Sequence, residues 1–156
     1  LSVKFSPCGQ YVLAGYHNGI LVKYSTEDGS VVVQQDKREL PANCVAWCPG
    51  NNEYCIAGYE DGLVIAYNAE NGEALRHLKS HTQSVTCIDW NRHHVATGSA
   101  DFMICLWPSI VQGGKKVKTE VIGPDCELKG HTGIVKGLSF SPDGIRLASV
   151  GQDCAL

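Results

Sequence analysis

Short apolar segments alternate with polar turns along the whole chain. Segments such as 12–15, 45–47, 63–67 and 95–98 hold β-branched, aromatic or small apolar residues, and each is only a few residues long. No segment sustains the 3.6-residue period of an amphipathic helix. The pattern therefore predicts an all-β chain built from short strands.

Turn residues separate these segments at equivalent places. In the run 141–144, Ser-Pro-Asp-Gly, proline presets φ at the first turn position and glycine accepts a positive φ. The runs 6–9 and 48–50 have the same place in earlier units. A second kind of turn, at Asp28-Gly29 and Asn71-Gly72, leads into predicted outer strands at 30–34 and 73–78.

The segments form a repeat of four units. Its aromatic anchors are Phe5, Trp47, Trp90 and Phe140, so successive anchors are 42, 43 and 50 residues apart. A period in the low forties fits a propeller blade of four short strands. The longer last interval indicates an insertion at 108–124, which we interpret as an extended surface loop. The predicted blades span 1–35, 43–79, 84–129 and 134–156.

Two consecutive units carry ordered motifs that resemble the WD-repeat family. The motifs are Ser80-His81, Trp90, Ala96-Thr97-Gly98-Ser99, Asp101 and Trp107, followed by Gly130-His131, Phe140, Ser141-Pro142-Asp143-Gly144, Leu147-Ala148-Ser149 and Asp153. The resemblance covers the chain apart from the insertion. It implies a β-propeller of four-stranded antiparallel blades, of which three and a half to four are present as a partial ring. Since closure protects the sheet edges of a propeller, we expect the chain to be part of a longer protein.

The resemblance also implies a hydrogen-bonded tetrad of His, Ser or Thr, Asp and Trp in a complete blade. The matching residues are His81, Thr97, Asp101 and Trp107, then His131, Ser149 and Asp153. The first two units depart from this pattern. They carry Ala14 and Ala57 at the hydroxyl position, Asn18 and Asp61 at the Asp position, Tyr24 and Tyr67 at the Trp position, and Arg38 where the second unit's His would stand. We expect these two blades to rely on packing and to be less rigid.

Residues beside each blade's first inner strand and before the tetrad Asp commonly line the partner-binding face in this family. The corresponding residues are His17, Pro41, Asn43, Glu60, Ser84, Thr86, Ala100, Ile134, Lys136 and Gln152. This set is mixed polar and contains no aromatic residue, which favours a spread contact surface over one deep hot spot.

The sequence contains little that indicates catalysis or cofactor binding. A His–Asp–Ser constellation could form a nucleophilic triad, but here it recurs from blade to blade and no GxSxG elbow is present. Phosphate-loop motifs are absent, His93-His94 has no nearby carboxylates, and none of the eight cysteines forms a CxxC pair. We therefore predict a non-enzyme with no metal and no cofactor.

The composition bears on the partners of the protein and on its cellular compartment. The net charge of −3 argues against non-specific nucleic-acid binding, and no apolar run is long enough to span a bilayer. Most cysteines stand in apolar runs, as buried free thiols do, which indicates a reducing compartment such as the cytoplasm or nucleus.

The sequence is compatible with two functions. The first is a scaffold for protein–protein interaction, with several protein partners in a large complex and no small-molecule substrate. The alternative is a substrate or peptide receptor, for example of a ubiquitin ligase. Receptors of the cullin type often carry Trp-Asp-x-Arg at the end of the third strand, whereas here Trp107 is followed by Pro108.

Overall fold

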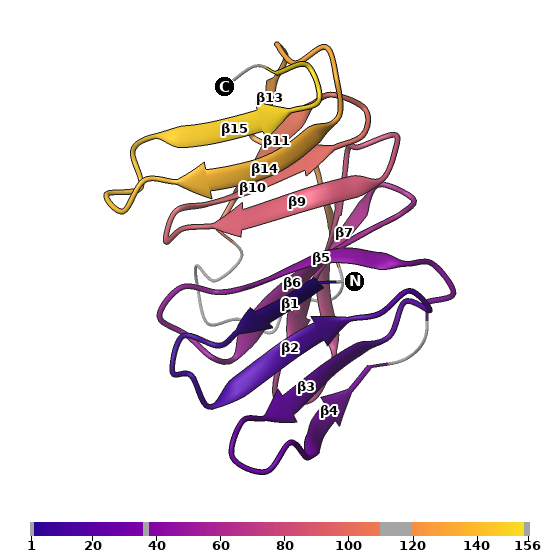
Figure 1. Cartoon of the computed structure of the whole chain (residues 1–156), viewed down its shortest axis with the longest axis vertical. Helices are drawn as coiled ribbons and strands as arrows, with labels where there is room; N and C mark the ends of the chain where they lie inside the picture. The colour runs from indigo at the N-terminus through magenta and orange to yellow at the C-terminus, as the bar shows by residue number, and fades with distance from the viewer. Residues whose placement is uncertain (1, 36–37, 110–119, 155–156) are drawn as a thin grey trace.

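The computed structural model describes residues 2–35, 38–109 and 120–154. Within these ranges the chain is all-β, without a helix. Four sheets follow one another along the long axis of the molecule (Figure 1). The prediction of an all-β chain arranged as a partial ring of sheets is confirmed.

The first sheet is a four-stranded antiparallel meander in the order β1-β2-β3-β4. Its strands are β1 (Ser2–Phe5), β2 (Tyr11–Gly15), β3 (Leu21–Ser25) and β4 (Val31–Gln34). The third sheet has the same design, in the order β9-β10-β11-β13. Its strands are β9 (Val85–Trp90), β10 (His94–Ser99), β11 (Ile104–Pro108) and β13 (Cys126–Leu128).

The second sheet contains β5 (Ala42–Trp47), β6 (Tyr54–Tyr59), β7 (Leu63–Asn68) and β8 (Ala74–Lys79). A fifth strand, β12 (Glu120–Ile122), pairs in parallel with β8, so that Val121 lies opposite His77. This differs from the expected four-stranded antiparallel blade, and from the loop predicted over 108–124. The reason is that the outer edge of β8 offers unpaired backbone groups, which the end of the insertion satisfies. Residues 110–119 of the insertion lie outside the described residues.

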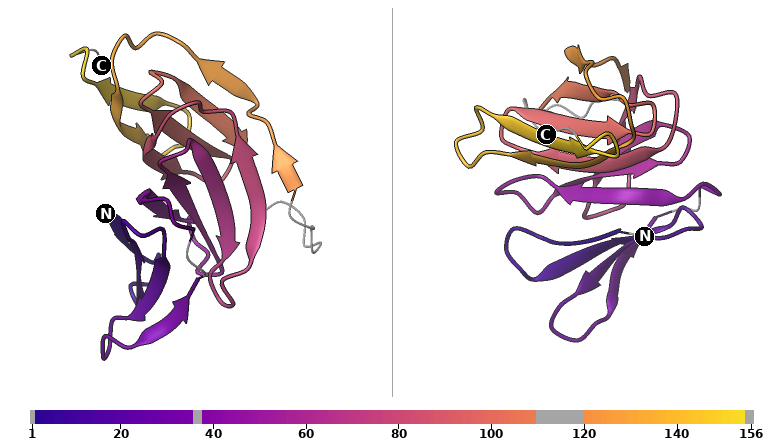
Figure 2. Two further views of the ribbon diagram at one scale, coloured as in Figure 1. Left: turned by 90° about the vertical axis from the view of Figure 1, so that its right-hand side faces the viewer. Right: turned by 45° about the horizontal axis from the view of Figure 1, so that its top comes forward.

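The fourth sheet contains β14 (Val135–Phe140) and β15 (Leu147–Gly151). Its turn has the predicted geometry, since Gly144 has φ of +72° and Gly9 and Gly50 have +74° and +71° in the equivalent turns. The sheets follow an arc, with the inner strands β1, β5, β9 and β14 side by side and β12 along the outer side of β8 (Figure 2).

The core lies between neighbouring blades. One apolar cluster joins the first and second sheets around Leu13, Trp47 and Tyr59, and another joins the second and third around Leu78 and Trp107. Close approach between blades depends on glycines in the second strands. A Cβ on Gly58 would lie 2.5 Å from Val85 Cγ1, and one on Gly98 would lie 2.6 Å from Val135 Cγ1.

Candidate interaction face and hydrogen-bonded networks

The third blade holds the four residues of its predicted tetrad in one chain of hydrogen bonds. His81 Nδ1 lies 3.0 Å from Asp101 Oδ2, and His81 Nε2 lies 2.8 Å from Thr97 Oγ1. Trp107 donates its indole N–H to Thr97 Oγ1 over 2.9 Å. The donors and acceptors match when Nδ1 carries the imidazole proton, because the Thr97 hydroxyl then donates to Nε2 while it accepts from the indole.

Asp101 also binds the backbone around it. The N–H groups of Thr82 and Met103 each donate to its carboxylate over 3.0 Å. Burial acts to raise the pKa of the Asp101 carboxyl, but these two bonds and the adjacent His81 outweigh it and hold the pKa below its usual value. The carboxylate therefore fastens the loop before β9 to the turn before β11.

The fourth blade repeats three members of this arrangement. His131 Nδ1 lies 2.9 Å from Asp153 Oδ2, and His131 Nε2 lies 2.8 Å from Ser149 Oγ. Thr132 N–H donates to the same carboxylate over 2.7 Å. The predicted residues His131, Ser149 and Asp153 thus lie together, as their counterparts do one blade earlier.

The first two blades use pairs of tyrosines instead. Tyr16 and Tyr24 bring their hydroxyl oxygens within 2.7 Å, and Tyr59 and Tyr67 bring theirs within 2.6 Å. We expected these blades to rely on packing in place of the full tetrad, and the tyrosine pairs correct this by adding a side-chain hydrogen bond to each blade. Tyr16 and Tyr59 stand one residue beyond the glycine of the second strand, where the third blade has Ser99, so a search of the tetrad positions missed them.

The tyrosine pair in the second blade is joined to an ion pair. Arg38 Nη2 lies 3.3 Å from Asp61 Oδ2, and the Arg38 guanidinium stacks 4.5 Å from the centre of the Tyr59 ring. Arg38 and Asp61 hold the positions of the missing His and its Asp. Burial raises the pKa of Tyr67 to about 12, so both hydroxyls of the pair are protonated near neutral pH.

The candidate partner-face residues gather at one end of the strands. The same backbone bond recurs in three blades: the N–H groups of Glu60, Ala100 and Gln152 donate to the carbonyls of Pro41, Ser84 and Ile134, respectively.

Three of these residues also bond to one another through their side chains. Asn43 Nδ2 lies 2.7 Å from both Glu60 Oε2 and Ser84 Oγ, and Ser84 Oγ donates to Glu60 Oε2 over 3.1 Å. Asn43, Glu60 and Ser84 therefore form a polar triangle across the second and third blades.

The remaining candidates differ in what they can offer a partner. His17 and Lys136 are exposed. Thr86 is half-buried, and its single hydroxyl proton is shared between the Gly98 carbonyl, 3.0 Å from Oγ1, and the Val135 carbonyl. Thr86 thus links the third and fourth blades through its side chain.

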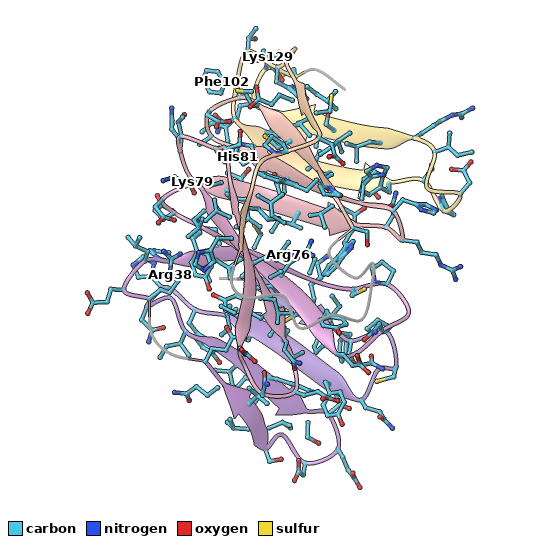
Figure 3. All side chains as sticks on the ribbon, turned by 180° about the vertical axis from the view of Figure 1, so that it is seen from behind. Arg38, Arg76, Lys79, His81, Phe102 and Lys129 are labelled. Carbon is cyan, nitrogen blue, oxygen red and sulfur yellow. The ribbon has the colours of Figure 1, made fainter. Side chains whose placement is uncertain are left out.

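An exposed aromatic residue, Phe102, lies at the same end of the blades and was missed in the sequence. The residue is 42% exposed, and its φ is +71°. The equivalent positions of the first two blades are Gly19 and Gly62, with φ of +80° and +82°. The signal that could have found it is an aromatic directly after the tetrad Asp, where the first two units have glycine and the fourth has Cys154, with φ of +59°. In Figure 3 Phe102 lies along one side of the molecule with Arg38, Lys79 and Lys129.

The described ranges also answer whether the chain could bind a metal, span a membrane or carry a reactive thiol. Within 2–35, 38–109 and 120–154, no three His, Cys, Asp or Glu side chains are placed to hold a metal ion. In the same ranges, no helix is long and apolar enough to cross a membrane. The cysteines are free, and burial raises the pKa of Cys55 to about 12 and of Cys105 to about 11. These two thiols are therefore protonated and unreactive near neutral pH.

Comparison with protein families gives two matches. Residues 33–93 match the model described as "Anaphase-promoting complex subunit 4 WD40 domain". Residues 123–156 match the model described as "WD domain, G-beta repeat". Together the two matches include the second blade, the fourth blade and part of the third.

Individual proteins with similar sequences or structures match half of the chain or nearly all of it. Histone acetyltransferase type B subunit 2 of Schizosaccharomyces pombe is 40% identical over 83 residues, which cover 51% of this chain and 19% of that protein. Telomerase protein component 1 of Mus musculus is 29% identical over 153 residues, which cover 98% of this chain and 6% of that protein. The chain thus spans a fifth or less of these relatives. A chain in the crystal structure of the mitotic checkpoint complex has the same fold, with a TM-score of 0.80 at 19% identity, covering 96% of this chain and 45% of that one.

Proposed function

Because the chain belongs to the WD-repeat family, we propose that it is a non-catalytic scaffold for protein–protein interaction within a multi-protein assembly. The names of similar proteins support this role, since they include a subunit of a histone acetyltransferase and a component of the mitotic checkpoint complex structure. The proposed binding surface, called here the Phe102 face, comprises His17, Pro41, Asn43, Glu60, Ser84, Ala100, Phe102, Ile134, Lys136 and Gln152.

An exposed aromatic side chain on a left-handed backbone, at Phe102, is the observation that carries this proposal. A left-handed backbone costs a residue with a Cβ about 1–2 kcal/mol. Glycine avoids that cost at the same position of the first two blades, whereas Cys154 shares the positive φ in the fourth. Phe102 is 42% exposed, so burial recovers only part of this cost. Strained residues of this kind gather at binding sites, and aromatic side chains are frequent hot spots of interfaces. We infer that Phe102 is an anchor for a protein partner.

The burial of Thr97 supports a structural role for the tetrad over a catalytic one. Its hydroxyl is fully buried and is bonded to both His81 and Trp107. A nucleophile must reach its substrate beside an oxyanion hole, and this hydroxyl has no exposed surface. The bond between a histidine and a hydroxyl recurs at His131 and Ser149, which fits a repeated structural element better than a single active site.

Affinity purification of the intact protein from cytosolic and nuclear extracts, followed by mass spectrometry, tests the proposal. A stable stoichiometric complex that is lost with Phe102→Gly would support a scaffold that uses this face. Recovery of ubiquitin-ligase subunits together with short-lived substrates would favour the receptor instead. If no protein is retained in a Phe102-dependent way, the proposal is wrong.

A further inference from the structure

The strand β12 builds a cavity on the outer part of the second blade. The cavity has a volume of about 340 Å³ and is lined by residues of β8, of the β6–β7 turn and of β12. We call it the β12 pocket, and its lining residues are Asp61, Gly62, Leu63, His77, Lys79, His81 and Val121. Its size lies within the range of pockets that hold small ligands or side chains.

The pairing of the strands explains why these side chains share one face. Val121 lies opposite His77 in the parallel pair of β12 and β8, and Leu63 lies opposite Lys79 in the antiparallel pair of β7 and β8. His77 and Lys79 are two residues apart, so they project from the same face of the sheet. Val121 is 66% exposed and provides an apolar wall, whereas Ile122 packs against the core between the second and third blades.

Gly62 forms part of the pocket wall. It has a positive φ, and a Cβ there would lie 2.5 Å from the His81 carbonyl oxygen and 2.9 Å from that of Gln83. The loop that carries His81 therefore rests directly on the backbone of the β6–β7 turn. Since His81 is itself fixed by Asp101 and Thr97, this wall is rigid.

Lys79 is an uncompensated charge at this pocket. Among the described residues, neither the Lys79 ammonium nor the His77 ring has a hydrogen-bond or ion-pair partner. The carboxylate that the described lining contains is already engaged. Asp61, which lines the pocket, pairs with Arg38 over 3.3 Å. Among the described lining residues, an incoming anion would therefore meet the free Lys79 ammonium and a carboxylate already paired with Arg38.

We propose that the β12 pocket binds a single oxyanion carried by a side chain of a partner protein. Lys79 would donate to the anionic oxygens, His77 would supply a second donor, and Leu63 and Val121 would contact the apolar stem of the side chain. The oxyanion could be a carboxylate or a phosphate group, which share this chemistry. The inference rests on the proposed function, because it supplies a feature of the partner.

Titration of the intact protein with inorganic phosphate and, separately, with sodium acetate tests the pocket without any partner. At constant pH and ionic strength, we expect the NMR signals of the His77 imidazole to shift and to saturate. Lys79→Gln should weaken this binding about tenfold, the usual effect of removing a hydrogen bond to a charged group. Tighter binding of phosphate points to a phosphorylated side chain of the partner, and tighter binding of acetate points to Asp or Glu.

Two matched variants control the test. Lys129→Gln removes an exposed cation two residues before His131, as Lys79 is two residues before His81, and should leave the titration unchanged. Val121→Asp should abolish binding by placing a carboxylate in the wall, whereas Val31→Asp, on the outer strand of the first blade, should not. Absence of saturation with both anions, or equal weakening by Lys79→Gln and Lys129→Gln, would overturn the inference.

The outcome is distinguishable from that of the proposed function. If Phe102→Gly releases a partner but neither anion binds at His77, only the pocket is refuted. If an anion binds but no partner depends on Phe102, the pocket stands as an anion site and the interaction face is refuted.

Discussion

The hydroxyl oxygens of Tyr59 and Tyr67 lie 2.6 Å apart inside the second blade. Tyr67 stands at the position of Trp107 in the third blade, where the indole binds a threonine hydroxyl. The second blade therefore keeps a buried polar contact between its second and third strands, although Ala57 replaces the threonine. Both blades thus have a hydrogen bond between side chains of their second and third strands, but different residues make it.

Tyr67→Phe should destabilise the protein by about 1–3 kcal/mol, because it leaves the buried Tyr59 hydroxyl without a partner. The free energy of unfolding from denaturant titration measures this effect. Tyr24→Phe is the matched control, since the Tyr16 and Tyr24 pair is half-buried and should contribute less. Tyr59→Phe with Tyr67→Phe should cost less than the sum of the two single changes, and strict additivity would contradict a direct hydrogen bond.

Thr97→Val should destabilise the third blade by roughly 2–4 kcal/mol, because the change keeps the shape but leaves both His81 Nε2 and Trp107 Nε1 without a partner. Thermal unfolding followed by tryptophan fluorescence would report it. Ser149→Ala removes the equivalent hydroxyl of the fourth blade, which is only partly buried, and should cost less. An equal cost for both variants would speak against a buried tetrad.

Asp101 should make stability depend on acid pH. Its pKa lies below the usual 3.8, so the carboxylate stabilises the folded state fully above that value, and this contribution is lost as the pH falls through the lower folded-state pKa. Unfolding free energies between about pH 5 and pH 2 should decline less steeply for Asp101→Asn than for the wild type. Parallel pH profiles of the two proteins would refute this role.

Gly98→Ala should destabilise the contact between the third and fourth blades by about 1–3 kcal/mol, the usual cost of overpacking. The new Cβ would lie 2.6 Å from Val135 Cγ1 and 2.7 Å from Cys87 Sγ. Gly130→Ala is a suitable control, because a Cβ there meets nothing within 4 Å. Adding Val135→Ala should restore part of the loss as seen by denaturant titration, and a neutral Gly98→Ala would contradict the tight packing.

Much of the fold follows from local signals in the sequence. The aromatic anchors Phe5, Trp47, Trp90 and Phe140 set the repeat, and the Pro and Gly turns locate the strand ends. The tetrad of the third blade could be predicted because each of its residues has a fixed place in the repeat. These features depend on short-range geometry, which recurs from unit to unit.

Other features depend on contacts that the repeat does not encode. β12 is three residues long and pairs with a strand more than forty residues earlier, so its sequence has no period to detect. The Tyr59–Tyr67 bond depends on two side chains that meet across strands, and only one of them occupies a tetrad position. Phe102 is visible as an aromatic residue, but its left-handed backbone is visible only in the structure.

Equilibrium binding between the intact protein and the partner recovered with it, compared for wild type and Phe102→Gly, tests the interaction face most directly. Glycine removes the ring but suits the positive φ, so the variant should be at least as stable as the wild type. We predict that it binds the partner about tenfold or more weakly, as expected for loss of a hot-spot side chain. Ile145→Gly, in the exposed turn at the other end of the strands, should leave affinity unchanged. Unchanged affinity for Phe102→Gly would contradict the proposed face.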